Sequence, residues 1–493
     1  MSEYEIIIIG SGAGGGTLAH ALAPSGKKIL IVERGEYLPR EKANWNPAAL
    51  FLESRYKTNE KWYDKKGKPF RPGMYYNVGG NTKVYGAALL RLRERDFEEV
   101  THSEGISPAW PLKYEDFRPY YLEAEKLYHV RGERGADPLD PPDDSPYFYP
   151  ALKHEEPLLT FFKKMQVMGY KPFPLPLGLR LKEKDRENSR CIRCDTCDGF
   201  PCLVDGKSDA EISCIKPALS HENVTLMTNA KAVRLETDPS GREITGVVVE
   251  REGREEKLRA KVYVLACGAV NSAALLLKSK NSSHPDGLAN SSGLVGRNYM
   301  CHINSAILSI HTKPNHSKFQ KTIGLNDFYF GAPDWEYPLG HIQLLGNLKK
   351  EMLKGKAPPF TPSYVLEKMA EHSIGWWLSS EDLPDPENRV TLTPSGEIAL
   401  HYTLKNQEGH KRLIKKLKKI IRAIEPALIL HEPMPIGAVA HQVGTCRFGK
   451  DPKTSVLDLN CKAHDLDNLY VVDGSFFPSS AAVNPGLTIM ANA

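Results

Sequence analysis

Four cysteines lie within twelve residues of the sequence, in CIRCDTCDGFPC (191–202), at the spacing C-x2-C-x2-C-x4-C. Thiolates at this density suit one Zn²⁺ ion or an iron–sulfur cluster. Zinc sites usually separate two C-x2-C pairs by a longer loop, and the spacing is not that of a ferredoxin. We therefore favour structural thiols or a disulfide at Cys191, Cys194, Cys197 and Cys202 over iron–sulfur and over zinc, and we assign no metal ligands.

A second group of residues suits the binding of a dinucleotide. In EIIIIGSGAGGGTLAHALA, Gly10, Gly12 and Gly15 fit the pattern G-x-G-x-x-G. The first glycine allows a tight turn, the second admits a pyrophosphate to the backbone, and the third allows close packing of helix and strand. The free N–H groups at the start of the following helix would face the phosphates.

This motif has the sequence context that it needs. Residues 6–9 read as a buried parallel strand, and KKILIVERG supplies a second strand that ends in Glu33 and Arg34. The Glu33 carboxylate can accept hydrogen bonds from both ribose hydroxyls of an adenosine. The sequence therefore predicts a dinucleotide site, and this motif alone leaves NAD and FAD open.

The overall composition is that of an ordinary globular protein. The chain has 493 residues, 41% of them hydrophobic, and a formal net charge of +5 from 65 basic and 60 acidic residues. This balance gives no reason to expect a nucleic-acid partner, and no apolar run reaches the ~18 residues of a membrane-spanning helix. The N-terminus does not resemble a secretory signal, and nine cysteines are an odd number, so we expect thiols and a cytoplasmic location.

Further along the chain, the pattern changes from α/β alternation to strands and turns. A second glycine loop lies in 76–97, a proline-rich loop spans 131–150, and an apolar strand over 262–266 leads into a helix. From about residue 301, segments such as NSAILSIHTK, HIQLLGNL, HSIGWWLS, RVTLTP and EIALHYTL read as strands of a larger, mostly antiparallel sheet. Residues 409–424 form an amphipathic helix whose basic face we interpret as solvated.

The C-terminal segment returns to a pattern typical of a cofactor-binding domain. A strand over 469–472 ends in Asp473 and Gly474. Asn484 and Pro485 then precede a final helix, as a cap and as a first helical residue.

Four segments together resemble the glucose–methanol–choline (GMC) family of flavin oxidoreductases. They are IIIIGSGAGGG with VERG, VGGNTKVYGAALLRLRERDF, HQVGTCRFG, and VVDGSFFPSSAAVNPGLTIMANA. They occur in the family's order and span the chain, and LACGAVNSAALLL and GLVGRNYM match two further family segments. Within the family, the chain is most similar to the sugar-oxidising bacterial branch, with its pyranose and glycoside 3-oxidases and gluconate-type dehydrogenases.

The resemblance implies FAD as the cofactor and a mixed α/β fold of two domains. A Rossmann-like FAD domain is expected from 1–130, 205–300 and 440–493, and a substrate domain with a large antiparallel sheet from 131–204 and 301–439. The flavin is expected along Gly79, Gly80, Asn81 and Thr82, with Asp473 and Gly474 near its pyrophosphate and ribityl chain. The remaining expected FAD contacts are Arg34, Val233, Ala266, Gly268 and Pro485. Covalently flavinylated members carry a histidine after the double glycine, and this chain has Asn81-Thr82-Lys83-Val84-Tyr85, so we expect non-covalent FAD.

Oxidation of an alcohol carbon removes a hydride from carbon and a proton from oxygen, so a base must stand beside the flavin. A neutral imidazole is a suitable base. Taken alone, His441 is one histidine among sixteen and reads as structural, and Asn484 reads as a helix cap. The family places a catalytic base at the position of His441 and a His or Asn partner at the position of Asn484, which would donate its amide N–H to the substrate oxygen.

The sequence thus predicts FAD-dependent oxidation of a CH–OH group of a sugar, glycoside or related alcohol. O₂, a quinone or a redox protein is expected as electron acceptor. One alternative is a dehydrogenase subunit of an electron-transfer complex with an iron–sulfur cluster on the four cysteines, since some family members carry such a cluster at a different cysteine spacing. Another is a cofactor-bound or zinc-bound interaction protein without turnover. No G-x-S-x-G motif is present, which disfavours hydrolysis. Trp376, Trp377, His341 and Gln343 are candidates for a sugar-binding platform, or else for the core.

Overall fold

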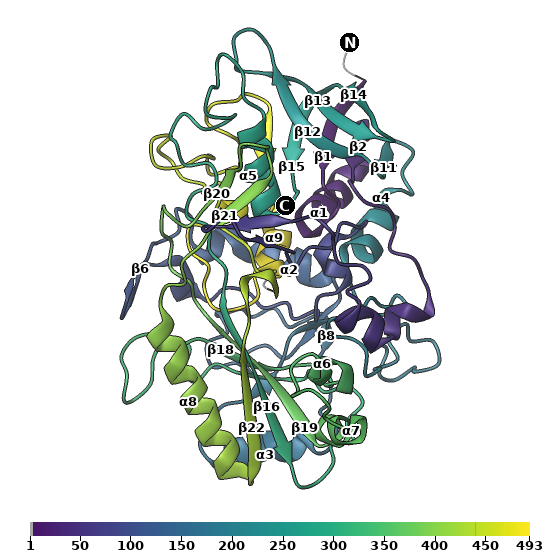
Figure 1. Ribbon diagram of the computed structural model, residues 1–493, viewed down its shortest axis with the longest axis vertical. Helices are drawn as coiled ribbons and strands as arrows, with labels where there is room; N and C mark the ends of the chain where they lie inside the picture. The colour runs from purple at the N-terminus through teal and green to yellow at the C-terminus, as the bar shows by residue number, and fades with distance from the viewer. Residues whose placement is uncertain (1–2, 439) are drawn as a thin grey trace.

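A computed structural model describes residues 3–438 and 440–493. The molecule is elongated, with a parallel sheet in one half and a large antiparallel sheet in the other (Figure 1). The fold class predicted from the sequence, mixed α/β with several sheets, is confirmed.

The parallel sheet has five strands in the order β11-β2-β1-β15-β23. Their bounds are β1 Tyr4–Ile9, β2 Ile29–Val32, β11 Val224–Met227, β15 Ala260–Leu265 and β23 Leu469–Val471. Apolar runs cover both faces: every residue of β2 is buried, as expected for parallel strands with both faces covered. The sheet thus joins segments from the start, middle and end of the chain.

The strand order reverses at β1, because β2 and β15 follow it in the chain and pair on opposite sides of it. Ligands of open α/β sheets bind at such a point, beyond the carboxyl ends of the strands. Helix α1 (Ala13–Leu22) begins there directly after the glycine turn, and α5 (Ala269–Lys278) begins after β15. A three-stranded meander, β12 Lys231–Thr237, β13 Ile244–Arg251 and β14 Arg254–Leu258, flanks this part of the molecule (Figure 1).

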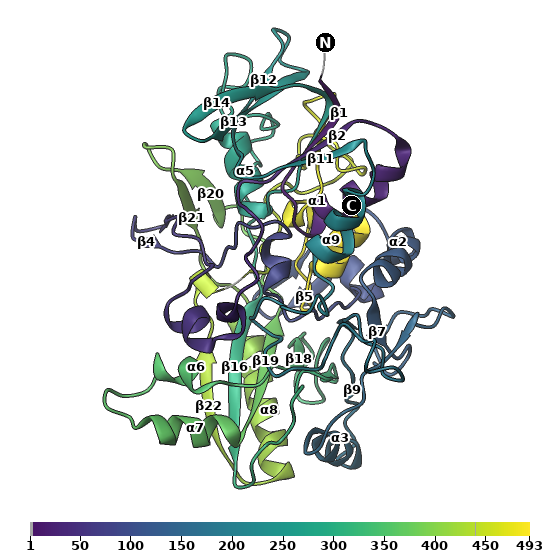
Figure 2. The same cartoon turned by 90° about the vertical axis from the view of Figure 1, so that its right-hand side faces the viewer.

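The second large sheet has six antiparallel strands in the order β22-β16-β19-β18-β17-β9. Their bounds are β9 Phe173–Pro174, β16 Ile303–His311, β17 Ile323–Leu325, β18 His341–Leu344, β19 Ser373–Ser380 and β22 Ala427–Pro433. Helix α8 (Gln407–Ile424) packs its apolar face on this sheet, with α3 (Leu158–Val167) beside it (Figure 2). The predicted amphipathic helix and three of the predicted strands, β16, β18 and β19, belong to this layer.

Two predicted strands lie elsewhere. β20 (Arg389–Leu392) and β21 (Ile398–His401) form a separate sheet with β3 (Trp62–Asp64) and β4 (Pro69–Phe70). Residue Ala399 pairs in parallel with Tyr63, so this sheet joins the expected substrate segment to the expected FAD segment. The sequence pattern marks these strands but carries no signal for their partner.

The remaining elements are short. They include α2 (Tyr114–Leu127), α4 (Lys216–Ala218), α6 (Lys350–Lys354), α7 (Ser363–Glu371) and α9 (Gly486–Asn492), and the strand groups β5 Val100–His102 with β6 Gly105–Ser107, and β10 Leu177–Gly178 with β7 Val130–Gly132 and β8 Tyr149–Pro150. α9 begins one residue later than predicted, so Pro485 precedes the helix rather than starting it. None of the described helices is long and apolar enough to cross a membrane.

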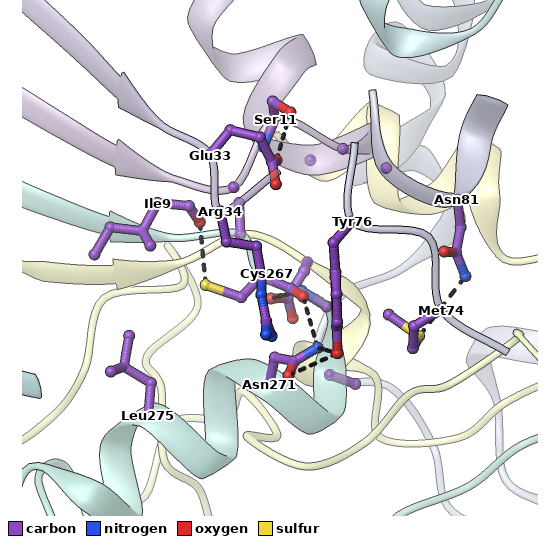
Figure 3. Close-up of a pocket in the computed structure, with 18 of the residues that line it drawn as sticks. Ile9, Ser11, Glu33, Arg34, Met74, Tyr76, Asn81, Cys267, Asn271 and Leu275 are labelled. Carbon is purple, nitrogen blue, oxygen red and sulfur yellow. Dashed lines mark hydrogen bonds between the residues drawn. The ribbon is translucent and has the colours of Figure 1, made fainter. Parts of the chain in front are cut away.

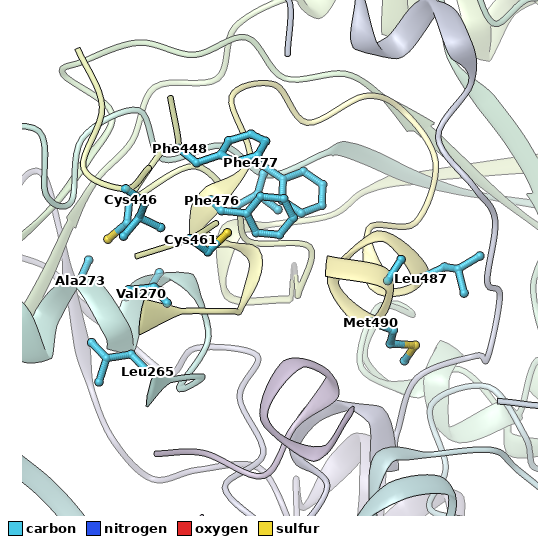
Figure 4. Close-up of a cluster of buried hydrophobic side chains, with 14 of the residues drawn as sticks. Leu265, Val270, Ala273, Cys446, Phe448, Cys461, Phe476, Phe477, Leu487 and Met490 are labelled. Carbon is cyan, nitrogen blue, oxygen red and sulfur yellow. The ribbon is translucent and has the colours of Figure 1, made fainter. Parts of the chain in front are cut away.

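The C-terminal segment is anchored by an aromatic cluster. Phe448, Phe476 and Phe477 pack edge-on around Trp110, next to Leu487 of α9 (Figure 4). All of these side chains are buried. This packing buries a residue that follows His441 in the chain and two that precede Asn484.

Candidate active site

A deep cavity lies at the switch point of the parallel sheet, at the carboxyl ends of β1, β2 and β15 (Figure 3). Most residues of the predicted FAD set line it: Gly10, Gly12, Glu33, Arg34, Gly80, Asn81, Thr82, Ala266, Gly268, Asp473 and Gly474. Gly15, Gly79, Val233 and Pro485 do not line it. Val233 alternates with Ala232 along β12, and it is Ala232 that faces the cavity.

The three glycines of the fingerprint have different local surroundings. Gly10 has a φ of +106°, and a Cβ there would lie 2.3 Å from the carbonyl oxygen of Ala266. A Cβ on Gly15 would lie 2.0 Å from the carbonyl oxygen of Gly10, so this glycine allows α1 to approach the turn. Gly12 differs, because nothing lies within 4 Å of its missing Cβ. That empty space belongs to the cavity, where a ligand can approach the backbone.

Ser11 links three segments of the cavity wall. Its Oγ accepts from the N–H of Gly79 (3.1 Å) and donates to Oε2 of Glu33 (2.6 Å). The N–H groups of Ser11 and Gly35 also donate to the Glu33 carboxylate. Burial raises the pKa of Glu33, and these hydrogen bonds act in the opposite direction. The acid at the end of β2 is thereby fixed at the rim of the cavity.

Beside Glu33, Arg34 covers an aromatic wall. Its guanidinium lies 3.7 Å from the ring centroid of Tyr76 and pairs with Glu60. The Tyr76 hydroxyl donates to Glu60 Oε2 at 2.5 Å (Figure 3 shows Arg34 and Tyr76). A planar cation on a planar ring gives this end of the cavity a flat lining.

Asp473 connects two parallel strands at the opposite wall. Its Oδ2 accepts from the N–H of Gly268, after β15, at 2.9 Å and from Ser272 Oγ at 2.5 Å, and its Oδ1 accepts from the N–H of Ser475. Burial raises the pKa of Asp473, against the effect of these donors. The carboxylate therefore fixes the ends of β15 and β23 relative to each other.

The loop of the double glycine is fixed by buried polar groups. Thr82 Oγ1 donates to the carbonyl of Gly79, and the N–H of Ala210 donates to Thr82 Oγ1. Lys83 is buried and pairs with Asp209 (3.0 Å) and Glu211 (2.6 Å). A Cβ on Gly80 would lie 3.3 Å from Cα of Gly12, so the two glycine loops meet.

These residues fit FAD. The open space over Gly12, the acid at the end of β2, and the N–H groups at the start of α1 form the cradle that a dinucleotide requires. Gly80, Asn81 and Thr82 continue that cradle toward Gln442, which also lines the cavity. When bound, FAD supplies a two-electron acceptor for a hydride.

His441 and Asn484, predicted as the catalytic pair, are brought together. Asn484 Nδ2 lies 3.4 Å from His441 Nε2. The other ring nitrogen of His441, Nδ1, lies 2.9 Å from Nδ1 of His302. Burial, followed by the nearby His302 and Lys321, holds the pKa of His441 well below its usual range. Gln442 and Ala440, the neighbours of His441 in the chain, line the FAD cavity, so the pair stands at its edge.

The four residues proposed as a sugar platform lie on two opposite faces of the six-stranded sheet. Trp376 is 1% exposed and belongs to the core under α8, where it contacts Phe161, so it is not a platform residue. Trp377 and Gln343 are paired across β19 and β18, and both lie on the opposite face of the sheet. His341 shares that face, and its Nδ1 donates to Oδ1 of Asn326 at 2.6 Å. Because side chains alternate between the two faces along a strand, Trp376 lies on one face of the sheet and the other three residues lie on the other.

The four cysteines are free thiols, as are the other five. Within residues 3–438 and 440–493, no group of three or more His, Cys, Asp or Glu side chains is arranged to hold a metal ion. Burial raises the pKa of Cys191 to about 11, and Cys202 Sγ accepts from the N–H of Gly206. The choice between structural thiols and an iron–sulfur cluster on this segment stays a prediction.

A buried lysine contacts the cysteine segment. Lys207 is 1% exposed, and its Nζ lies 2.7 Å from the carbonyl oxygen of Phe200 and 2.8 Å from those of Cys197 and Tyr85. It therefore joins the cysteine segment to the loop that follows the double glycine. Next to Cys197, Asp198 pairs at 2.8 Å with buried Lys321, the same lysine that lowers the pKa of His441.

Ser11, Lys207, His302 and Lys321 are the residues of this site that sequence reasoning missed. Ser11 lies inside the glycine motif at a variable position, and the other three are single residues outside any motif. Only the register of the strands and loops brings them to the site.

Comparison with known proteins agrees with this geometry. Residues 175–304 and 384–493 match two models described as GMC oxidoreductase. The chain is 29% identical to paromamine 6'-oxidase of Streptomyces fradiae, over 99% of this chain and 90% of that protein. It is 24% identical to the fructose dehydrogenase large subunit of Gluconobacter japonicus, over 99% and 96%.

A solved structure shares the fold. Pyridoxine 4-oxidase from Mesorbium loti superposes with a TM-score of 0.69 at 18% identity, covering 99% of this chain and 97% of that one. The two family matches, together with the cavity and the paired His441 and Asn484, lead to one conclusion. The chain belongs to the GMC oxidoreductase family of FAD-binding flavoproteins and is an enzyme that acts on CH–OH donors.

Proposed function

We propose that this enzyme oxidises a CH–OH group of a sugar, a glycoside or a related alcohol, with His441 as the base that takes the hydroxyl proton. The observation that carries the proposal is the position of His441 Nε2, which faces the Asn484 amide at 3.4 Å beside the FAD cavity.

In this proposal, the substrate hydroxyl donates to His441 Nε2, and the Asn484 N–H donates to the same oxygen. The amide thus orients the hydroxyl, and the imidazole receives its proton while the carbon gives up the hydride. The low pKa of His441 keeps the imidazole neutral near pH 7 and ready to accept a proton.

We propose that FAD is bound without a covalent bond. No histidine lines the cavity among residues 3–438 and 440–493. The lining thiol of Cys267 donates to the carbonyl oxygen of Ile9 at 3.2 Å, and burial raises its pKa to about 12. This cysteine is therefore held as an unreactive thiol.

Polyhydroxylated substrates are the class that the site supports best. Two relatives are named for a sugar or an aminoglycoside, paromamine 6'-oxidase and the fructose dehydrogenase large subunit. In this chain, Trp377 is the partly exposed member of the four platform candidates, because Trp376, His341 and Gln343 are buried. The narrower assignment of this chain to the branch of the family that contains pyranose and glycoside 3-oxidases remains part of this proposal.

For the second half of the reaction, we propose O₂, a quinone or a redox protein as the electron acceptor. We also propose a cytoplasmic location, which the nine free thiols support because they suit a reducing compartment.

Anaerobic flavin reduction tests the proposal. The purified protein is mixed with D-glucose, D-fructose, a methyl glucoside and paromamine, and flavin absorbance is followed in the wild type and in His441→Ala. The wild type should be reduced by at least one compound, while His441→Ala should bind FAD and stay oxidised. His464→Ala is the matched control, since His464 contacts only Ser455 in a C-terminal loop. Flavin reduction in His441→Ala at the wild-type rate would contradict the proposed base.

A further inference from the structure

His302 stands behind the proposed base. It directly precedes β16, is 2% exposed, and packs its ring at 80° to that of His441, with 4.9 Å between ring centroids. Both of its nitrogens have partners: Nδ1 lies 2.9 Å from His441 Nδ1, and Nε2 lies 3.1 Å from the carbonyl oxygen of Ser480.

These contacts fix the positions of the ring protons. A carbonyl oxygen only accepts, so His302 Nε2 must carry a hydrogen and donate it to Ser480. Burial lowers the pKa of His302, so its ring is neutral and its Nδ1 holds a lone pair. The short contact between the two Nδ1 atoms then requires the hydrogen on Nδ1 of His441, which donates it to His302.

The contact at the other ring nitrogen of His441, Nε2, independently supports the same tautomer. With its hydrogen on Nδ1, His441 presents a lone pair at Nε2, and there Asn484 directs its amide nitrogen, a donor. The opposite tautomer would place an N–H of His441 against that amide N–H and would leave two lone pairs facing each other across the 2.9 Å contact.

We propose that His302 is a positioning residue that holds His441 in the Nδ1–H tautomer and so keeps Nε2 free to accept the substrate proton. This inference rests on the proposed function, because it needs His441 to be the base. The proton balance is simple: the hydroxyl O–H bond breaks, a bond from Nε2 to that hydrogen forms, and the Nδ1–H bond to His302 stays intact.

His302 itself is not suited to be the base. Its Nδ1 lone pair accepts from His441, and its Nε2–H is engaged by the Ser480 carbonyl, which cannot take up a proton. Nearby, the Glu381 carboxylate accepts hydrogen bonds from His102, Ser107 and the N–H of Ala481.

Two substitutions separate the hydrogen bond from the volume of the ring. In His302→Asn, the amide oxygen can accept from His441 Nδ1 as the imidazole nitrogen does, whereas His302→Leu fills the space without an acceptor. We expect His302→Leu to lower kcat for flavin reduction roughly 10- to 100-fold, part of the 10²–10⁴ that a general base contributes, with KM and FAD content little changed. His302→Asn should recover most of that loss.

A spectroscopic measurement tests the tautomer directly. In the FAD-loaded protein with ¹⁵N-labelled histidine, the ring signals of His441 are assigned by their loss in His441→Gln. The wild type should show a protonated Nδ1 and a bare Nε2, and His302→Leu should show a mixture. A wild-type Nε2–H tautomer would overturn the proposal, even if the leucine variant did not fold.

The two proposals fail in different ways. If His441→Ala still reduces the flavin normally, the assignment of the base is wrong. If that variant is inactive while His302→Leu keeps the wild-type kcat and tautomer, the base stands and the role of His302 is overturned.

Discussion

At the scale of single residues, the chemistry depends on charges placed around one imidazole. His441 has a second histidine and the Lys321 ammonium near it, and both lower its pKa, in addition to burial. Lys321 is fixed by Asp198 at 2.8 Å. His441, the proposed base, is therefore neutral near pH 7, because a base with a depressed pKa is protonated only at lower pH.

This arrangement predicts the pH profile. Because His441 is proposed to act in its neutral form, kcat/KM for flavin reduction should stay constant as the pH falls through 6.5, the ordinary histidine pKa. It should decrease only at a pH well below 6.5. The double variant Lys321→Met/Asp198→Asn removes the cation without leaving a buried unpaired carboxylate, and it should move the acid limb to higher pH. Lys321→Arg, which keeps the charge, should leave the limb in place. An unchanged limb in the double variant would mean that the Lys321 charge does not act on the base.

A single glycine gives a comparable test of the cofactor cradle. The Cβ position of Gly12 is empty space inside the cavity, so Gly12→Val should fold normally but weaken FAD binding, by roughly a hundredfold or about 2.7 kcal/mol. Gly355→Val is the control, because that glycine also has open space around it and an ordinary helical φ. Titration of the FAD-free variants with FAD, followed by flavin fluorescence, measures the difference. Equal affinity in both variants would place the pyrophosphate elsewhere.

At the scale of elements, the cysteine segment acts as a connector. The Lys207 ammonium holds carbonyl groups of this segment and of the loop after the double glycine. Asp198, which follows Cys197 in the same segment, pairs with Lys321, two residues before β17. The cysteine segment is thus joined to the loop after the double glycine through Lys207 and to Lys321 through Asp198.

Removal of the lysine should therefore do more damage than removal of the thiols. Lys207→Met leaves several buried carbonyl groups unpaired, at roughly 1–3 kcal/mol each, and should lower the melting temperature and loosen FAD. Cys194→Ser/Cys202→Ser should keep the flavin spectrum and the activity, with no iron or zinc in either protein. Lys261→Met is the control, since its exposed ammonium pairs with Glu5 on the surface. Loss of bound iron and of activity in the serine variant would instead restore the electron-transfer alternative.

The elements also show what sequence could and could not predict. The glycine turn and Glu33 follow from a local motif, because it carries its own strand, turn and helix signals. The His441–Asn484 pair follows from the family resemblance, since each residue taken alone reads as structural. Trp376 and Trp377 could not be separated without the direction of β19 relative to α8, since adjacent strand residues face opposite sides. His302 could not be found either, because only the pairing of distant loops places it behind His441.

At the scale of the whole molecule, the two large sheets are not independent units. β21 pairs with β3, and Trp62 of β3 is fully buried in the same core as Val390 and Leu400. That core also includes Phe173 of β9, a strand of the six-stranded sheet. A ligand that binds one part of such a core should stabilise all of it.

We therefore expect FAD-loaded protein to unfold in one transition, with flavin release and loss of structure at the same temperature. Leu417→Ala tests this from the far side of the molecule. Leu417 is fully buried between α8 and the six-stranded sheet, and truncation of such a leucine costs about 2–5 kcal/mol. The variant should release flavin at a lower temperature, by the same shift as its unfolding followed by circular dichroism. Val167→Ala on α3, where the side chain is 89% exposed, should shift neither. Flavin release that stays at the wild-type temperature while α8 unfolds earlier would show two independently folding parts. Equal shifts of flavin release and of unfolding would mean that the six-stranded sheet and the FAD cradle are coupled through the core that joins β3 to β21.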